Sequence, residues 1–561
     1  MGGSLRSATL LEGLNAAGEA ARLTFHLEGG THSLRSSEIA TRAAARAGGL
    51  RAAGVSPGDR VGVLGPNRPE WAISAFSVWA AGAVLVPIPF PIRIRDRSVF
   101  GDQVAALVRA AGSRLVLADP DLLDAVPAGA GLDWNDVPER GHGGVQAPPD
   151  PSAPAVVQFT SGGTASPKGA VLSHGAVVAS IGAMGRAYGF TPEDVFLGWL
   201  PFFHDNGLFG YLVRPLLMSS SGHVLPTERF ARIPREWLRL ATEVGATFTS
   251  GPPSGWSAAL RASLAEPEGI DLSTLRLGVL AAETVEPDLV GRLAERGPAL
   301  GLRAESLAVA YGLAEATLTV TITPPGSGIR IDEVDLDALG AGVGSPAVPG
   351  SRSRRVVSCG RPLPGLELRI AGEEPPGDRR VGEIQVRGPT VMDGYLGRSA
   401  PAAFADGWLR TGDLGYLADG ELFFVGRIKD VVVVLGRTYP AEDLEWAAAR
   451  VAGVRAGRCV AFSGGDGHVV VVVEPEPSAD PGALAASVRN AVVDATGITS
   501  TRALVVPRGT IPKTTSGKLR RHALREAFEA GGLPDAAAPV RPRTEGPARP
   551  TGTAGAPPGP P

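Results

Sequence analysis

Hydrophobic positions alternate between a helical period and a strand period along the first part of the chain. Residues 37–54 read as an amphipathic helix rich in Ala and Arg, and residues 60–64 form a short apolar run typical of a strand. The same order repeats, with a helical pattern over residues 71–82 and a strand-like run over 83–86. Such alternation favours an α/β layered domain.

The pattern changes in the second half of the chain. Further strands are predicted at residues 275–281 and 307–309, and from about residue 381 strands predominate. A compositional break lies near residues 426–430, and after it a strand at 469–474 and a helix at 481–496 indicate a smaller α+β unit. The strand-rich stretch comprises residues 382–388, 421–426 and 431–435.

We therefore expect the α/β class, with a large N-terminal domain of layered α/β subdomains that ends in a β-rich lobe. This domain should span residues 1–427, and a small α+β C-terminal domain should span residues 428–535. Residues 536–561 are rich in Pro, Ala, Gly and Arg and have no apolar periodicity, which predicts disorder.

Length and composition agree with this division. The chain has 561 residues, more than one hydrophobic core usually serves, and its net charge of −3 gives no general attraction for nucleic acid or an anionic membrane. Cys359 and Cys459 are too few for a disulfide framework, which fits a reducing cytoplasm. We expect a cytoplasmic protein with no signal peptide and no membrane span.

Residues 159–170 read FTSGGTASPKGA and follow a predicted buried strand at 155–159. Gly162 and Gly163 allow backbone N–H groups to turn towards one point, and Lys168 adds a positive charge. Such a cradle suits a polyphosphate, although it lacks the Gly-Lys-Ser/Thr ending of the Walker loop. By itself, a loop of this composition is also typical of an ordinary surface turn.

Five further segments decide whether this loop is a phosphate-binding loop or an ordinary surface turn. They are WLPFFHDNGL at 199–208, AYGLAEAT at 310–317, RTGDLG at 410–415, GRIKD at 426–430 and IPKTTSGKLRR at 511–521. Together with the loop they resemble, in the same order, the motifs of the adenylate-forming ligases. This superfamily contains acyl-CoA synthetases, firefly-type luciferases and the adenylation domains of peptide synthetases.

The resemblance implies ATP and Mg²⁺ as cofactors and a carboxylic acid as substrate. Lys518 matches the lysine that neutralises charge as the carboxylate attacks the α-phosphate, and Lys429 matches the hinge of a mobile C-terminal domain. Glu315 matches the metal ligand, and a single carboxylate together with phosphates suits Mg²⁺. In the family, His204 lies in a segment that lines the acyl pocket, so we take Lys518, His204 and Glu315 as candidate catalytic residues.

The remaining candidates also follow from the resemblance. Tyr311 should stack on adenine, Asp413 should bind the ribose, and Arg427 should lie near the nucleotide. The full nucleotide-binding set is Thr160, Ser161, Gly162, Gly163, Thr164, Lys168, Ala282, Glu283, Tyr311, Gly312, Thr317, Asp413 and Arg427. The substrate-pocket set is Phe203, His204, Asp205, Ser250 and Gly251.

Taken singly, these motifs have ordinary structural explanations as well. An isolated histidine such as His204 is often a core residue, and an early Glu such as Glu315 is favourable at a helix start. A Gly-Asp turn is common, and the charged run at 426–430 also suits a surface turn before a strand. The functional interpretation therefore depends on the ordered set.

Several details resemble fatty acyl-AMP ligases, which transfer the acyl group to a carrier-protein phosphopantetheine rather than to CoA. These are residues 200–208, 311–318 and 357–365, and a long stretch at 321–356 whose VDLDAL at 334–339 is similar to an extra segment of that branch. That segment is thought to disfavour transfer to CoA. It could equally be a plain surface insertion, so both acyl carrier protein and CoA stay open as acceptors.

Two positions depart from the family pattern. Gly163 stands where Ser or Thr is usual, and Ala165 stands where Gly is usual. These changes leave open a ligase that is impaired in ATP activation and uses preformed acyl-AMP. A luciferase-like oxygenase and a non-catalytic nucleotide binder are the alternatives of other classes, and the joint presence of Lys518, Glu315 and Asp413 argues against the second.

Overall fold

The computed structural model describes residues 7–91, 94, 96–139, 149–160, 168–372, 378–397, 403–434, 437–464, 468–513 and 519–536. Several sequence predictions lie outside these residues. They concern the phosphate-loop residues Ser161, Gly162, Gly163, Thr164 and Ala165, the lysine Lys518, and nearly all of the tail expected at 536–561.

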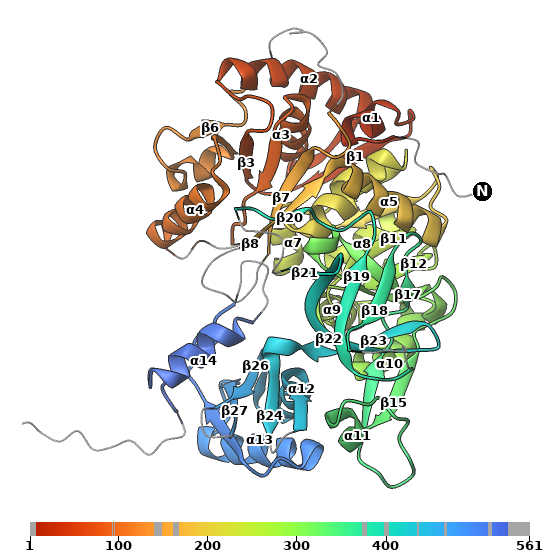
Figure 1. Cartoon of the computed structure of the whole chain (residues 1–561), viewed down its shortest axis with the longest axis vertical. Helices are drawn as coiled ribbons and strands as arrows, with labels where there is room; N and C mark the ends of the chain where they lie inside the picture. Colours follow the sequence, from red (N-terminus) through yellow and green to blue (C-terminus); the bar gives the residue numbers. More distant parts are fainter. Residues whose placement is uncertain are drawn as a thin grey trace, which may run out of the picture.

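Two large sheets form the centre of the body in the upper part of Figure 1. Parallel pairs dominate the middle of both sheets, which agrees with the predicted alternation of strands and helices. The nine-stranded sheet runs in the order β17 (Arg361–Pro362), β14 (Thr319–Ile322), β13 (Leu307–Gly312), β12 (Leu277–Leu280), β11 (Phe248–Gly251), β9 (Val195–Gly198), β10 (Ser221–Val224), β1 (Arg22–Leu27) and β2 (Gly30–Arg35). The seven-stranded sheet runs in the order β20 (Gly394–Tyr395), β8 (Lys168–Ser173), β7 (Pro154–Thr160), β4 (Val84–Pro87), β3 (Arg60–Leu64), β5 (Leu115–Ala118) and β6 (Gly131–Asp133).

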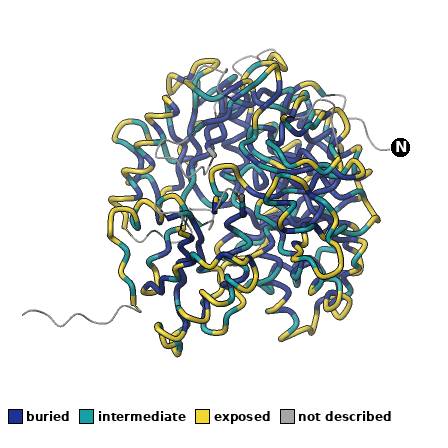
Figure 2. Tube along the Cα trace, turned by 60° about the horizontal axis from the view of Figure 1, so that its bottom comes forward, coloured by how far each residue is buried: buried dark blue, intermediate teal, exposed yellow. Residues whose placement is uncertain are grey.

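Helices pack around these sheets, and Figure 2 shows the buried residues concentrated in the interior and the exposed ones at the periphery. The α-helices of this body are α1 (Leu10–Asn15), α2 (Ser36–Ala52), α3 (Pro69–Ala80), α4 (Arg97–Ala111), α5 (His174–Tyr188), α6 (Arg214–Leu217), α7 (Thr227–Arg232), α8 (Arg235–Val244), α9 (Pro253–Ala265) and α10 (Pro287–Arg296). A π-helix, η2, spans Asn206–Val213, and short 3₁₀ turns span Pro120–Ala125 (η1), Gly297–Leu300 (η3), Ala304–Ser306 (η4) and Ala314–Ala316 (η5). Among the described residues, no helix is both long and apolar enough to cross a membrane.

A β-rich lobe follows, as the strand pattern after residue 381 predicts. It contains β18 (Glu367–Ile370), β19 (Gly382–Arg387), β22 (Trp408–Ala418), β21 (Phe404–Ala405) and β23 (Glu421–Arg427), with β23 paired to β22. Beside it lies a hairpin of β15 (Ile331–Asp335) and β16 (Ser353–Val357), with α11 (Leu336–Gly340) between the two strands. We call residues 331–357 the inserted hairpin, because they overlap the stretch at 321–356, whose residues 334–339 are similar to part of the extra segment of the fatty acyl-AMP ligases.

The C-terminal part is a small α+β region, drawn in blue at the bottom of Figure 1. It contains the strand pair β24 (Val431–Val434) and β25 (Arg437–Pro440), the three-stranded sheet of β26 (Val454–Ser463), β27 (Val469–Pro475) and β28 (Thr501–Val505), and the helices α12 (Ala441–Ala449), α13 (Pro481–Thr496) and α14 (Arg521–Glu529). The five consecutive valines of β27 alternate between two separate cores, one on each face of the sheet. This arrangement confirms the predicted α/β class with a small α+β C-terminal part.

Local signals explain why many elements were recognisable. Helix α13 has the predicted bounds because Asp480 caps its first turn, accepting a hydrogen bond from Ala483 N at 2.8 Å, and Pro481 takes the first helical position. Gly497 ends the helix with φ of 74°, a conformation that favours glycine. Strand β3 likewise coincides with the predicted strand at residues 60–64.

The buried His174 and the half-buried His223 lead us to expect that acid destabilises this fold. Burial lowers the pKa of His174 to about 4, and burial together with His26 and Arg22 lowers the pKa of His223 to about 4. In the unfolded chain these rings bind protons near pH 6.5, whereas in the folded chain they do so only near pH 4. The free energy of unfolding is therefore undiminished above pH 6.5 and decreases as the pH falls towards 4. Each shift corresponds to about 3 kcal/mol at most.

We therefore expect the melting temperature to fall steadily between pH 6.5 and 4.5. The His174→Gln and His223→Gln double variant should show a flatter pH profile, whereas His32→Gln, at an exposed position, should keep the wild-type slope. Differential scanning fluorimetry over this pH range measures the effect. An unchanged slope in the double variant would show that other groups cause the acid sensitivity.

Candidate active site

A buried carboxylate lies where the β-rich lobe meets the nine-stranded sheet. Asp413 on β22 accepts a hydrogen bond from the Tyr311 hydroxyl at 2.9 Å, and Arg427 Nε lies 3.3 Å from its other oxygen. Burial raises the pKa of Asp413, while Arg427 and the Tyr311 hydroxyl act in the opposite direction. The structure thus brings together three predicted nucleotide-binding residues from three separate motifs.

Tyr311 is the penultimate residue of β13, and its ring is stacked with that of Phe424, with centroids 6.1 Å apart. The next residue, Gly312, has no room for a side chain, because a Cβ atom there would lie 1.8 Å from the Leu318 carbonyl oxygen. The tight turn after β13 therefore requires glycine and brings residues 314–317 back beside the strand.

Glu315 lies in this turn and is oriented by a tyrosine of the seven-stranded sheet. Its Oε1 accepts a hydrogen bond from the Tyr395 hydroxyl at 2.7 Å, and its carbonyl oxygen accepts one from Met392 N at 2.8 Å. Lys168 Nζ lies 5.2 Å from the centre of the Tyr395 ring. Tyr395 therefore contacts both Glu315 and Lys168. The sequence motifs did not single out this tyrosine.

Two further candidates have unusual backbone conformations. Thr317 is fully buried with φ of 69°, and its hydroxyl donates to the Thr390 carbonyl oxygen at 2.7 Å. Ala282 follows β12 with φ of 71°. Non-glycine residues rarely adopt such values, and they cluster at functional sites. The adjacent Glu283 accepts hydrogen bonds from the Ser254 N–H and hydroxyl at 3.2 and 3.1 Å.

The segment that carries His204 is fixed by two buried amides. Asn67 donates to the Leu200 carbonyl oxygen and accepts from Phe202 N, both at 2.8 Å, while Gln158 donates to the Phe203 carbonyl oxygen at 2.9 Å. His204 Nδ1 lies 2.5 Å from Asp205 Oδ1, and the Phe203 and Phe90 rings pack edge to face. The pocket candidates Phe203, His204 and Asp205 therefore lie on a rigid turn.

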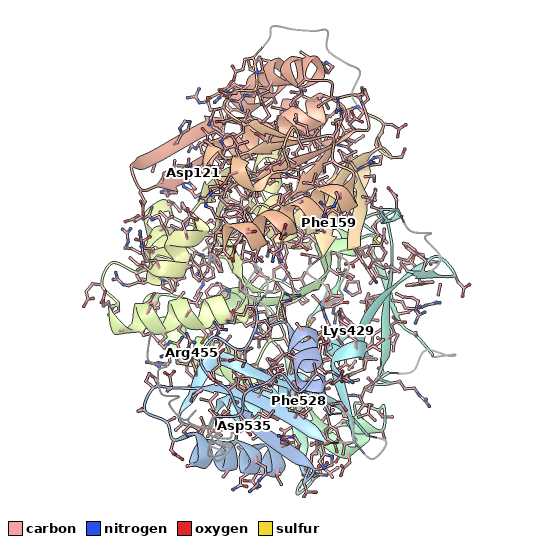
Figure 3. All side chains as sticks on the ribbon, turned by 90° about the vertical axis from the view of Figure 1, so that its left-hand side faces the viewer. Asp121, Phe159, Lys429, Arg455, Phe528 and Asp535 are labelled. Atoms are coloured by element: carbon pink, nitrogen blue, oxygen red, sulfur yellow. The ribbon has the colours of Figure 1, made fainter. Side chains whose placement is uncertain are left out.

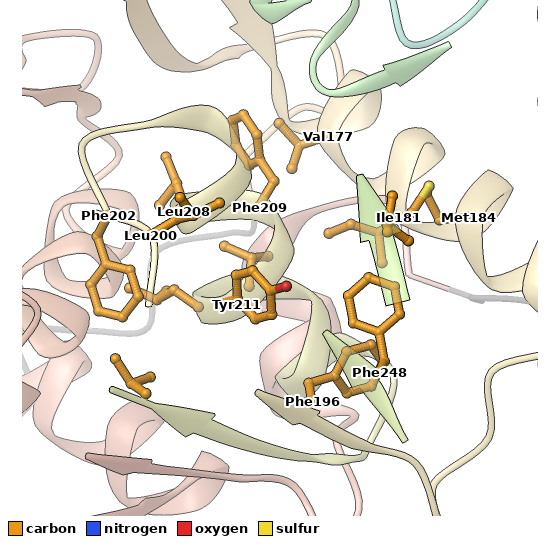
Figure 4. Packing of buried hydrophobic residues seen from close by; sticks show 14 of the residues in the cluster. Val177, Ile181, Met184, Phe196, Leu200, Phe202, Leu208, Phe209, Tyr211 and Phe248 are labelled. Atoms are coloured by element: carbon orange, nitrogen blue, oxygen red, sulfur yellow. The ribbon is translucent and has the colours of Figure 1, made fainter. Parts of the chain in front are cut away.

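The π-helix η2 begins directly after this turn, and π-helices occur frequently at functional sites. Its Tyr211 hydroxyl lies 2.7 Å from Ser250 Oγ, to which Asn206 also donates at 3.2 Å. Gly251 has no room for a side chain, since a Cβ atom would lie 2.9 Å from the Trp237 ring. The pocket candidates at 203–205 and 250–251 are thus linked through η2, whose packing is shown in Figure 4.

Lys429 lies between the two parts of the molecule. Figure 3 shows it below Phe159 of the upper body and above Arg455 and Phe528 of the C-terminal region. Burial lowers its pKa, as do the positive charges of Arg427 and Lys168. The positive charges of Lys168, Arg427 and Lys429, which come from two motifs, therefore act close to Asp413, an arrangement suited to a polyphosphate anion.

Comparisons with known proteins identify the family of this chain. The AMP-binding enzyme family matches residues 15–396. Rv1013 of Mycobacterium tuberculosis is 36% identical over 86% of this chain and 92% of its own length. The medium-chain-fatty-acid–[acyl-carrier-protein] ligase JamA of Moorena producens is 30% identical over 85% of this chain and 87% of its own.

A solved structure from work on the fatty acyl-adenylate ligases of E. coli and L. pneumophila superposes with a TM-score of 0.88 at 29% identity. It covers 94% of this chain and 99% of its own. The chain therefore belongs to the family of AMP-binding enzymes. It is an AMP-forming acyl ligase of the fatty acyl-AMP ligase and acyl-CoA synthetase type, and membership implies the use of ATP.

Proposed function

We propose that this enzyme activates a fatty acid with ATP to acyl-AMP and then transfers the acyl group to the phosphopantetheine thiol of an acyl carrier protein, in preference to CoA. The observation that carries the choice of acceptor is the set of contacts between the inserted hairpin and the C-terminal region. Transfer to a carrier protein is also what the name of JamA describes.

In the first step a carboxylate oxygen of the acid attacks the α-phosphorus, and the bond to the leaving pyrophosphate breaks. Positioning and charge stabilisation supply most of the catalysis in such a step. We assign the positive charge to Lys168 and Lys518, and the positioning of the nucleotide to Asp413, Tyr311 and Arg427. The remaining nucleotide and pocket candidates would line the same space.

The carboxylate of Glu315 fits a magnesium ion, because Mg²⁺ prefers a single carboxylate together with phosphate oxygens and water. The Tyr395 hydroxyl holds that carboxylate in place through the 2.7 Å hydrogen bond. Mg²⁺ would neutralise charge on the departing pyrophosphate. Tyr395 is therefore proposed as a positioning residue for Glu315.

In the second step a thiol sulfur attacks the acyl carbon, the bond between that carbon and the phosphate oxygen breaks, and AMP leaves. We propose that residues 428–535 rotate about Lys429 between the two steps, as the resemblance implies. Such domain gating is a common way to separate two reactions in one site. Any contact that holds the C-terminal region in the observed arrangement therefore opposes that rotation.

The inserted hairpin makes such contacts. Arg354 of β16 is buried, with Nε 2.9 Å from Asp443 Oδ2 on α12, and its Nη2 donates to the Val425 carbonyl oxygen at 3.2 Å. Arg352 Nη1 donates to the Thr496 carbonyl oxygen at 2.8 Å, at the C-terminus of α13, where a cation is favourable. Burial raises the pKa of Asp443 to about 6, and Arg354 acts against that shift.

Rotation of the C-terminal region would separate Arg354 from Asp443 and break the hydrogen bond from Arg352 to the Thr496 carbonyl oxygen, and these losses cost free energy. A carrier protein brings a protein–protein interface, which can offset that cost when the C-terminal region moves. CoA is a small ligand and offers much less surface. The contacts of Arg352 and Arg354 therefore favour a carrier protein as acceptor.

Removing one member of the pair should weaken this preference. In Asp443→Ala, Arg354 would be buried without a carboxylate in the observed arrangement. Rotation of the C-terminal region would expose Arg354 to water, so the substitution should favour the rotated arrangement. We expect the rate of acyl-CoA formation to rise by about tenfold or more, with acyl-AMP formation unchanged. Asp419→Ala, which removes the partner of the exposed Arg330, is the matched control and should have no effect.

The acceptor itself is tested by mass spectrometry of the products formed from a panel of fatty acids, ATP and either CoA or a phosphopantetheinylated carrier protein. The proposal predicts that the wild-type enzyme forms mainly the acylated carrier protein and little acyl-CoA. Efficient acyl-CoA formation with no acylation of the carrier protein would refute the proposed acceptor.

A further inference from the structure

A fully buried arginine lies beyond the pocket candidates. Arg214, the first residue of α6, is 2% exposed, and its Nε and Nη2 both donate to the Gly210 carbonyl oxygen, at 3.2 and 3.0 Å. Its Nη1 is buried without a hydrogen-bond partner among the described residues. The guanidinium lies within 4.5–5.6 Å of the ring centres of Phe190, Phe196 and Phe248.

No carboxylate of the described chain pairs with this cation. The titratable groups that act on Arg214 are the hydroxyls of Tyr211 and Tyr188, and the Tyr188 hydroxyl is also buried without a partner. A buried guanidinium without a counter-ion is costly, and such groups are normally paired. Arg214 Nη1 and the Tyr188 hydroxyl are thus two unused donors in one apolar region.

The π-helix η2 leads from the candidate active site to these donors, and helix α5 ends at one of them. Along α5, the buried side chains Val177, Ile181 and Met184 follow helical spacing and end at Tyr188. Along η2, buried side chains lead from the turn at His204 and Asp205 to Arg214. Figure 4 shows side chains of both helices on either side of one apolar cluster.

The length of this path defines the ligand. Arg214 follows Asp205 by nine residues, and eight of the intervening positions form the π-helix η2, so the helical path is at most roughly 13 Å, the length at the larger α-helical rise. This distance suits an extended acyl chain of medium length. Met184 on the path is flexible and unbranched, so it can move to admit such a chain.

We propose that the acyl substrate runs between α5 and η2, and that Arg214 and Tyr188 bind an anionic group at its far end. The favoured class is a medium-chain α,ω-dicarboxylic acid. One oxygen of the distal carboxylate accepts from Arg214 Nη1 and the other accepts from the Tyr188 hydroxyl. This inference rests on the proposed adenylation function, since it identifies the acid that is activated.

The test is ATP–pyrophosphate exchange with decanoic, ω-hydroxydecanoic and decanedioic acids. A hydrogen bond to a charged group changes binding by about 10- to 100-fold, so wild type should prefer decanedioic to decanoic acid by at least about tenfold in kcat/KM. Arg214→Met should reverse this preference, and Tyr188→Phe should reduce it severalfold. The ratio of two acids is the readout, because a purely structural role would change both rates together.

The outcomes separate the two proposals. No exchange with any acid would refute the adenylation function itself. Exchange with decanoic acid at least as efficient as with decanedioic acid in wild type would overturn the distal site and leave adenylation intact. If Arg214→Met does not fold, the comparison of wild type with Tyr188→Phe tests the site. A preference for decanedioic acid that is the same in wild type and in Tyr188→Phe would also overturn the distal site.

Discussion

Replacing Lys518 by alanine is expected to abolish acyl-AMP formation while sparing thioester formation from synthetic acyl-AMP. The charge of Lys518 is proposed to act only when the carboxylate attacks the α-phosphate. By analogy with a lost oxyanion donor, the substitution should cost about 3–4 kcal/mol, or on the order of 10²–10³ in rate. Pyrophosphate exchange measures the first reaction, and carrier acylation from acyl-AMP measures the second.

The described residues that flank residues 514–518 are fixed by hydrogen bonds. The buried Glu474 on β27 accepts hydrogen bonds from Gly509 N at 2.9 Å and Ile511 N at 3.0 Å, and Lys513 pairs with Leu519 in an antiparallel bridge. Arg508→Ala removes an exposed cation near this loop and serves as the control, with both reactions unchanged. An equal loss of both reactions in Lys518→Ala would contradict the proposed division of labour.

A second large effect is expected for Asp413. Asp413→Ala would leave Arg427 and the Tyr311 hydroxyl without the carboxylate that both now contact, and it would remove the proposed ribose ligand. Losing hydrogen bonds that involve a charged group costs about 1.5–3 kcal/mol each, so the KM for ATP should rise by about 100-fold or more. The melting temperature should fall as well, because the site is buried.

Unlike the loss of Lys518, this change should impair both reactions, since AMP is bound in each of them. Asp413→Asn, which keeps the shape of the side chain, should fall between wild type and Asp413→Ala. Titration with AMP gives the binding constants directly. Wild-type affinity for AMP in Asp413→Ala would exclude Asp413 from the nucleotide site.

Much of the fold could be predicted because its signals are local. The cap, proline and terminal glycine of α13 define that helix within the sequence itself, and the run of valines defines β27. The π-helix η2 has no such signal, because the usual helical period does not describe it. Its position became clear only with the packing of Tyr211 against Ser250.

The candidate site was predictable where one motif supplies one residue, as for Tyr311, Asp413 and Arg427. Contacts between distant segments were missed. Tyr395 reaches Glu315 only because β20 pairs with β8, and Arg354 meets Asp443 only because the inserted hairpin lies beside α12. Strand pairing and docking over such separations depend on tertiary structure, which the motifs do not encode.

The most direct test of the account is isotope transfer from the acid to AMP. The enzyme is incubated with ATP, Mg²⁺, an acceptor thiol and a fatty acid whose carboxylate carries oxygen-18, and the AMP released is analysed by mass spectrometry. Attack of the carboxylate on the α-phosphorus predicts AMP that carries one labelled oxygen, with pyrophosphate as the other product. Unlabelled AMP, or no AMP from acid and ATP while synthetic acyl-AMP still acylates the thiol, would contradict the proposed activation step.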